Sequence, residues 1–166
     1  MQYTTKYNSP LGEILIATDN EGITGLWFVG QKYFAKNLGT NYIEKDIPVL
    51  LDAKRWLDIY FSGVEPNFKL PIHFIGTTFQ IDVWDILCKV PYGKTITYGE
   101  ISKKIALKNN IKSMSSQAVG SAVGRNPISI IVPCHRVIGK DGNLTGYAGG
   151  IDRKEELLKL EKIKGK

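Results

Sequence analysis

The chain has 166 residues, of which 43% are hydrophobic, and a formal net charge of +6. This length suits one large domain or two small ones, and 2 cysteines are too few for a disulfide framework. The start of the chain lacks the basic and apolar regions of a signal peptide, and no run of about 18 apolar residues occurs. We therefore expect a soluble, cytoplasmic protein that does not enter membranes.

Positive charge is concentrated between residues 89 and 140. This segment holds nine lysines and arginines but a single acidic residue, Glu100. A basic segment of this kind favours a polyanionic partner, because binding to phosphates releases counterions. A solvated basic surface is the alternative that charge alone leaves open.

The first part of the chain predicts a small sheet covered by a helix. Turn signals and alternating residues indicate antiparallel strands over residues 11–18 and 23–29. Apolar residues at helical spacing then predict a helix over residues 48–61. We interpret His73, in an apolar patch, as a hydrogen-bonded structural histidine. Nothing in this part indicates chemistry.

A change of composition at residues 76–78, Gly-Thr-Thr, marks our predicted domain boundary. We expect an N-terminal αβ domain over residues 1–76 and a second domain over residues 77–166. The second domain opens with a helical pattern, and Cys88 lies in it among apolar neighbours. We interpret Cys88 as an inert, buried thiol.

Two short helices joined by a polar turn follow. Thr97 and Glu100 have the spacing of a capping box at the start of the first helix, and Ser113 or Ser115 can cap the second. One face of the second helix is apolar, with Ala118, Val119, Ala122 and Val123, and another is nearly free of large side chains, with Gln117, Gly120, Ser121 and Gly124. Such a helix-turn-helix can approach a nucleic-acid groove closely, whereas tight packing on another protein element is the alternative.

Cys134, which carries the most reactive type of side chain in the sequence, follows an apolar run. Residues 128–132 predict a buried strand that ends at Pro133, which would present Cys134 at the end of the strand. Because only the thiolate is nucleophilic, the neighbours His135 and Arg136 favour an activated thiol. A small buried hydrophobic residue is the alternative reading of Cys134.

The end of the chain predicts a helix that carries a buried carboxylate. Residues 146–150 form a glycine-rich loop, and Asp152 and Glu155 suit the first turn of the helix after it. Leu157 lies one turn before Glu161, so Glu161 points to the same apolar face. A carboxylate there needs a partner, and His135 is our candidate; a partly exposed glutamate is the alternative.

The segment from Asn126 to Gly150 resembles the signature of the O6-alkylguanine-DNA alkyltransferases. The resemblance rests on Asn126-Pro127, the apolar run, residues 133–137 (Pro-Cys-His-Arg-Val), Tyr147 and the glycine pair that ends the segment. It covers residues 77–163, and earlier residues match only as the variable αβ domain of that family. The implied fold is α/β (α+β), with a small N-terminal antiparallel-sheet αβ domain, ribonuclease H-like, and a mostly helical winged helix-turn-helix domain.

The resemblance also implies a reaction. The base is flipped out of the duplex, and Cys134 takes the alkyl group irreversibly, one group per molecule. His135 acts as base on Cys134 through a water molecule, and Glu161 orients His135. Tyr98 donates a proton or hydrogen bond to the departing guanine. Asn126 ties the second helix of the helix-turn-helix, the recognition helix, to the segment that carries Cys134. Arg136 is structural.

The resemblance assigns two further groups of residues. The substrate pocket consists of Val137, Tyr147, Ala148, Gly149 and Gly150. The DNA-binding residues are Ser115, Ser116, Gln117, Ala118, Gly120, Ser121 and Arg125. The family commonly has an arginine where this chain has Gln117, which weakens the expected flipping wedge. The implied partner is double-stranded DNA that contains O6-alkylguanine and, as a further candidate lesion, O4-alkylthymine. We expect a monomer without cofactor or metal.

Three other functions fit parts of the pattern. A non-catalytic lesion-binding relative would carry a bulky residue in place of Cys134. A Cys-His hydrolase of the papain type would need an oxyanion hole and would turn over repeatedly. A helix-turn-helix regulator would bind one DNA sequence far more tightly than others.

Overall fold

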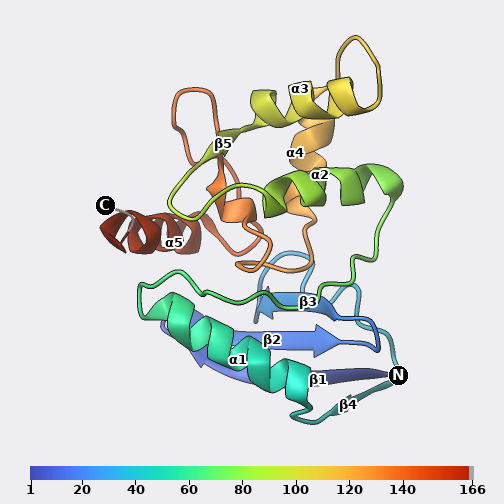
Figure 1. Cartoon of the computed structure of the whole chain (residues 1–166), viewed down its shortest axis with the longest axis vertical. Coiled ribbons are helices and arrows are strands. Elements are labelled where there is room, and N and C mark those ends of the chain that lie inside the picture. The colour runs from blue at the N-terminus through green and yellow to red at the C-terminus, as the bar shows by residue number, and fades with distance from the viewer. Residues whose placement is uncertain (165–166) are drawn as a thin grey trace.

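The structure is a computed structural model that describes the backbone of residues 1–164 and the side chains of residues 1–162. Residues 165 and 166, the end of the predicted second domain, lie outside this range. A sheet with one helix forms the lower part of the molecule and a group of helices forms the upper part (Figure 1). The elements of the lower part are β1 (Gln2–Ser9), β2 (Gly12–Thr18), β3 (Ile23–Phe28), β4 (Tyr42–Glu44) and α1 (Pro48–Phe61). Those of the upper part are α2 (Thr78–Cys88), β5 (Ile96–Thr97), α3 (Tyr98–Lys108), α4 (Ser116–Gly124), a 3-10 helix (Cys134–Arg136), β6 (Val137–Ile138) and α5 (Ile151–Lys164).

The sheet has the strand order β3-β2-β1-β4. The strands predicted over residues 11–18 and 23–29 are confirmed to within one residue. The short β4 was not predicted, and it pairs with β1 in parallel, so only the first three strands form an antiparallel sheet. Helix α1 has the predicted bounds and buries Leu50, Ala53, Leu57 and Tyr60. Figure 1 shows α1 lying along one face of the sheet, below the helices of the upper part.

The outer edge of β3 holds the two parts together. All six residues of β3 are buried. Ile23 pairs with Ile72 of the connection between the parts, and Leu26 pairs with Ile128 of the segment before Cys134. The N–H of Leu26 donates to Pro127 O at 2.8 Å, and the N–H of Ser129 donates to Leu26 O at 3.0 Å. The edge strand thereby gains hydrogen-bond partners and fixes the position of the segment that precedes Cys134.

The prediction of a strand over residues 128–132 is wrong. After the bridge at Ile128 the chain turns, with Ile130 at a φ of 69° and a hydrogen bond from Val132 N to Ile128 O. The predicted burial is right, since Ile128, Ile130 and Val132 are at most 1% exposed. The buried Asn126 side chain causes the difference, because it bonds the backbone of Ile128 and Val132 and so offers an alternative to a strand ladder.

The helix-turn-helix is present as predicted. Thr97 and Glu100 form both hydrogen bonds of a capping box, and Ser115 caps α4 by accepting from Ala118 N. Val119, Ala122 and Val123 are buried, but Ala118 is only half-buried. Within residues 1–164, no helix combines the length and the apolar composition that crossing a membrane requires.

The prediction of a buried Cys88 is wrong. Cys88 is the last residue of α2, where the helix passes beyond the core, and it is exposed. Protein packed around its sulfur and the nearby Asp85 carboxylate nevertheless raise the pKa of Cys88 to about 11. The burial on which the prediction of an inert thiol rested is absent, but a thiol with this pKa stays protonated at neutral pH, so we still expect Cys88 to be unreactive.

Candidate active site

Cys134 lies on the wall of a cavity of about 330 Å³. Its position at the start of the 3-10 helix follows from the turn that Asn126 holds, and only 5% of the residue is exposed. The cavity is lined by Lys32, Tyr33, Tyr98, Gly120, Ser121, Val123, Gly124, Cys134, Gly146, Tyr147 and Ala148. Residues of both parts of the molecule thus surround the thiol, and those of the upper part include residues of α4.

The structure brings together His135 and Glu161, the pair suggested by the sequence. His135 Nε2 lies 2.5 Å from Glu161 Oε2, and His135 is fully buried. The other ring nitrogen, Nδ1, is buried and has no hydrogen-bond partner among the residues that the structure describes. The helix α5 places Glu161 here by burying Leu157 one turn earlier.

Four donors surround the Glu161 carboxylate. Oε2 also accepts from Tyr60 Oη at 2.6 Å, while Oε1 accepts from Arg136 Nε at 2.8 Å and from Gly93 N at 3.0 Å. Burial by itself raises the pKa of Glu161, but the hydrogen bonds and charges of His135 and Arg136 outweigh it and lower the pKa to about 2. Glu161 is therefore ionised at neutral pH, and Arg136 compensates its charge.

Burial sets the resting protonation states of the other two groups. It raises the pKa of the Cys134 thiol, against the smaller opposing effects of Asn126 and Lys154. It also lowers the pKa of His135, although Glu161 acts in the opposite direction. The sequence suggested that the neighbours of Cys134 activate its thiol. In the resting protein, however, they do not make it a thiolate. The site instead combines a neutral thiol with a neutral imidazole that can accept a proton.

Lys154 was missed by the sequence reading. It is fully buried on α5, and its Nζ donates to the carbonyls of Leu144 and Gly146. Burial lowers its pKa to about 8, and its charge also acts on Cys134. Lys154 lies three residues before Leu157, so extending the apolar face of α5 by one turn would have found it.

The loop after the 3-10 helix supplies the opposite wall. Tyr147 is half-buried with its hydroxyl enclosed, and this burial raises its pKa well above the usual value. Tyr98 Oη lies 3.0 Å from Thr145 Oγ1, which joins α3 to this loop. A Cβ on Gly149 would lie 2.8 Å from the Tyr147 ring, so a glycine is needed there. The remaining members of the predicted pocket, Val137, Gly149 and Gly150, do not line the cavity.

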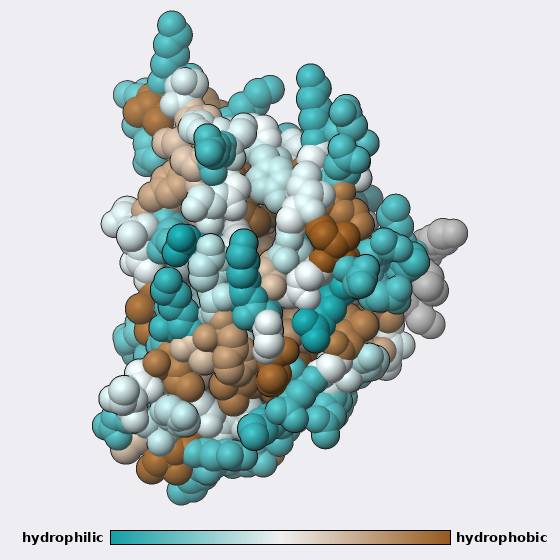
Figure 2. All heavy atoms as spheres, turned by 180° about the vertical axis from the view of Figure 1, so that it is seen from behind, coloured by the Kyte–Doolittle hydropathy of each residue, from teal (hydrophilic) through white to brown (hydrophobic). Residues whose placement is uncertain are grey.

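The predicted DNA-binding residues lie along α4. Ser115, Ser116, Gln117, Ser121 and Arg125 are exposed, and Gly120 and Ser121 also line the cavity beside Cys134. Arg125 stacks on Tyr33 at 4.8 Å from the ring centroid, which ties the end of α4 to the sheet part. Seen from behind, long hydrophilic side chains project from the upper part of the molecule (Figure 2). The face of α4 that carries these exposed residues is therefore accessible to solvent.

His73 has the hydrogen bonds expected of a structural histidine. Its Nδ1 lies 2.6 Å from Asp19 Oδ2, and its Nε2 lies 3.2 Å from Glu21 Oε2. Its backbone N–H donates to Ile23 O at 2.9 Å. His73 thus ties the connection between the two parts to the turn before β3.

Comparison with known proteins identifies the family. The model of the 6-O-methylguanine DNA methyltransferase ribonuclease-like domain matches residues 2–74, and that of the DNA-binding domain of the same family matches residues 78–163. The methylated-DNA–protein-cysteine methyltransferase of Methanosarcina acetivorans is 46% identical over 96% of this chain and 97% of its own length. That of Haemophilus influenzae is 44% identical over 97% of this chain and 87% of its own length.

A solved structure agrees with these matches. The crystal structure of the Mycobacterium tuberculosis O6-methylguanine methyltransferase is 40% identical in sequence, with a TM-score of 0.83, and the match covers 99% of this chain and 94% of that one. A structure of the M. tuberculosis protein in complex with DNA is 39% identical, also with a TM-score of 0.83, over 98% of this chain and 94% of that one. The predicted fold class and the family resemblance are confirmed: this chain belongs to the 6-O-methylguanine DNA methyltransferase family.

Proposed function

We propose that this protein repairs DNA by transferring the alkyl group of O6-alkylguanine to Cys134. Residues 77–166 bind the DNA and accept the alkyl group, and residues 1–76 support them. The observation that carries the proposal is the position of Cys134 in a cavity that Gly120 and Ser121 of the recognition helix also line. A base extruded beside α4 enters next to the thiol.

The transfer is a displacement at the alkyl carbon. The proton of Cys134 passes to His135 Nδ1 through a water molecule, and Glu161 stabilises the imidazolium that results. The sulfur then forms a bond to the alkyl carbon while the bond from that carbon to guanine O6 breaks. The electron pair of the broken bond stays with guanine, and Tyr98 donates a hydrogen bond or proton to the departing ring.

The product does not regenerate the thiol. A thioether has an sp³ carbon that offers water no acyl-type electrophile, so one molecule repairs one lesion. The alkyl group comes from the lesion and stays on the protein, so the proposed reaction needs no cofactor. The protein acts as a monomer on double-stranded DNA, and O4-alkylthymine is a second candidate lesion because its alkyl carbon has the same chemistry.

The side chain of Gln117 occupies the gap that the flipped nucleotide leaves. Its exposed position in the first turn of α4 fits this role, and its amide can hydrogen-bond to the base that is left unpaired in the opposite strand. The other residues of the recognition surface are Ser115, Ser116, Ala118, Gly120, Ser121 and Arg125. The small side chains of the serines, Ala118 and Gly120 let the helix approach the groove, and Arg125 adds a positive charge for phosphate.

The test is intact-mass measurement after incubation with duplex DNA that contains one O6-methylguanine. We expect a gain of one methyl group per molecule, and peptide mapping should place it on Cys134. Repeated turnover without a change of mass would indicate a hydrolase instead. Tight lesion binding without a gain of mass would indicate a non-catalytic lesion-binding protein.

A further inference from the structure

Tyr60 reaches the active site from the sheet part of the molecule. It lies in the last turn of α1 and is fully buried. Its Oη lies 2.6 Å from Glu161 Oε2, which belongs to α5, and 3.4 Å from His135 Nε2, which belongs to the 3-10 helix. Three separate elements therefore meet at this point, and one of them lies in the part of the chain where the sequence indicated no chemistry.

The two distances decide the direction of the hydroxyl proton. A 2.6 Å contact to an ionised carboxylate is a strong, charge-assisted hydrogen bond, whereas 3.4 Å is near the limit for any hydrogen bond. The single proton of Tyr60 therefore points to Glu161. The Tyr60 oxygen then presents lone pairs, not a proton, to His135 Nε2.

This arrangement fixes the tautomer of His135. Nε2 faces two acceptors, Glu161 Oε2 and Tyr60 Oη, so Nε2 must carry a proton. A neutral imidazole carries only one N–H, which leaves Nδ1 with a free lone pair. Nδ1 is the nitrogen that has no hydrogen-bond partner among the described residues. It is thus available as the base for Cys134.

We propose that Tyr60 is a positioning residue of the transfer reaction, which fixes the Glu161 carboxylate and holds His135 in the tautomer whose Nδ1 accepts the proton of Cys134. The inference rests on the proposed alkyl transfer to Cys134 and extends its machinery to residues 1–76. Tyr60 does not line the cavity and acts only through Glu161 and His135.

The surroundings of Tyr60 suit this role. Trp56 stacks on its ring at 5.5 Å with an interplanar angle of 6°, and Phe61 packs edge-on at 5.4 Å. These contacts leave the ring little freedom, so the hydroxyl is held in one place. Burial, assisted by Glu161, also raises the pKa of Tyr60, which keeps the hydroxyl protonated.

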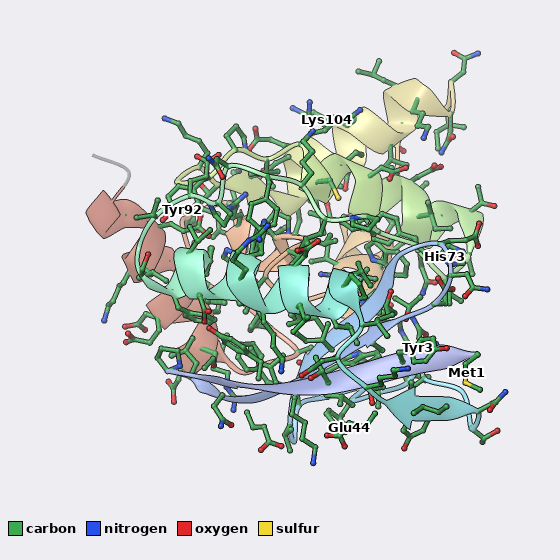
Figure 3. All side chains as sticks on the ribbon, turned by 60° about the horizontal axis from the view of Figure 1, so that its bottom comes forward. Met1, Tyr3, Glu44, His73, Tyr92 and Lys104 are labelled. Atoms are coloured by element: carbon green, nitrogen blue, oxygen red, sulfur yellow. The ribbon has the colours of Figure 1, made fainter. Side chains whose placement is uncertain are left out.

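Tyr92 offers a matched control. Its ring packs edge-on against Tyr60 at 6.2 Å, and Figure 3 shows it close to the end of α1. Its hydroxyl has no hydrogen-bond partner among the described residues. Tyr92→Phe therefore removes the same atom from the same neighbourhood without breaking a hydrogen bond, while Tyr60→Phe removes the bond to Glu161.

The kinetic test is single-turnover methyl transfer from duplex O6-methylguanine DNA at several DNA concentrations. For Tyr60→Phe we expect the maximal rate to fall about tenfold, as the loss of a hydrogen bond to a charged group implies. The half-saturating DNA concentration should stay unchanged, because Tyr60 lies away from the recognition face. Tyr92→Phe should match the wild type in both. A wild-type maximal rate for Tyr60→Phe, or equal slowing by both variants, would overturn the proposal.

A second measurement needs no change at Tyr60. Nitrogen NMR of the imidazole rings reports which nitrogen carries the proton, and because the chain has 2 histidines, His73→Gln assigns the signals. We expect His135 protonated at Nε2 only; protonation at Nδ1 instead would overturn the proposal. If the wild type took up no methyl group, the proposed function would fail. The tautomer of His135 would still test the proposed role of Tyr60, because it is measured without the reaction.

Discussion

Glu161 and Arg136 form a buried ion pair in which Glu161 Oε1 lies 2.8 Å from Arg136 Nε. Only 2% of the Glu161 side chain and 10% of the Arg136 side chain are exposed. Arg136 Nη1 also donates to Val90 O at 2.7 Å, so the guanidinium is fixed on both sides. The resemblance implied a structural Arg136, and its contacts support the carboxylate that is bonded to His135.

The Glu161 carboxylate, whose pKa is lowered first by His135 and then by Arg136, predicts a specific loss of stability in acid. The pKa of Glu161 falls from 4.5 to about 2 on folding, so its contribution is fully present above pH 4.5 and is lost as the pH falls through about 2. This difference corresponds to about 3 kcal/mol in the free energy of unfolding. Urea unfolding of the wild type from pH 6 to pH 2 should show this loss.

The variant Glu161→Gln removes that titration. Its free energy of unfolding should be lower than that of the wild type at pH 6, because Arg136 loses its charged partner, and the gap should shrink toward pH 2. Glu156→Gln, at an exposed position of the same helix, should follow the wild-type pH dependence. A constant gap between Glu161→Gln and the wild type would contradict the assigned pKa.

The two cysteines should differ completely as alkyl acceptors. Cys134→Ser should take up no methyl group from O6-methylguanine DNA and should still bind DNA, because Cys134 lies below the recognition face. Cys88→Ala should keep wild-type uptake, because a pKa of about 11 leaves Cys88 protonated. Intact mass and a DNA-binding titration measure both. Uptake by Cys134→Ser together with none by Cys88→Ala would reverse the assignment.

Gln117 should control extrusion of the nucleotide but not the chemistry. An arginine fills the gap, bonds to the unpaired base and attracts phosphate, so Gln117→Arg should speed transfer from duplex DNA. Gln117→Ala should slow it by about 1 kcal/mol in activation free energy. Neither variant should change the reaction with free O6-benzylguanine, which needs no extrusion. Equal duplex rates for all three proteins would show that Gln117 is not the wedge.

Lys154 should affect both substrates alike. Lys154→Met removes the hydrogen bonds to the carbonyls of Leu144 and Gly146, which hold the loop that brings Tyr147 to the cavity. We expect transfer to fall roughly tenfold from duplex DNA and from free O6-benzylguanine, because the pocket wall loosens. Lys159→Met, at an exposed position of the same helix, is the control. A loss confined to duplex DNA would place the role of Lys154 in DNA binding.

The sequence predicted those features that short-range patterns determine. The bounds of α1, the capping box of Thr97 and Glu100, and the cap at Ser115 depend on residues within four positions of each other. The pairing of His135 with Glu161 was also within reach, because a carboxylate on an apolar helix face requires a partner.

Contacts between distant segments account for what was missed. The hydrogen bond of Tyr60 to Glu161 joins residues 101 positions apart, and no local pattern reports it. The turn over residues 128–132 looked like a strand because its burial comes from both parts of the molecule, while the side chain of Asn126 satisfies its backbone. Most buried tyrosine hydroxyls have a hydrogen-bond partner, which is the clue that Tyr60 offered.

The edge of β3 has a consequence for how the chain is made. Synthesis proceeds from the N-terminus, so Ile23–Phe28 leaves the ribosome long before Ile72 and Ile128 exist to cover it. Until then the nascent protein exposes an apolar strand with open backbone groups, which other chains can pair with. The same late event covers this edge and shapes the turn before Cys134. Docking of residues 127–129 therefore protects the Leu26 end of this edge and places the turn before Cys134 in a single step.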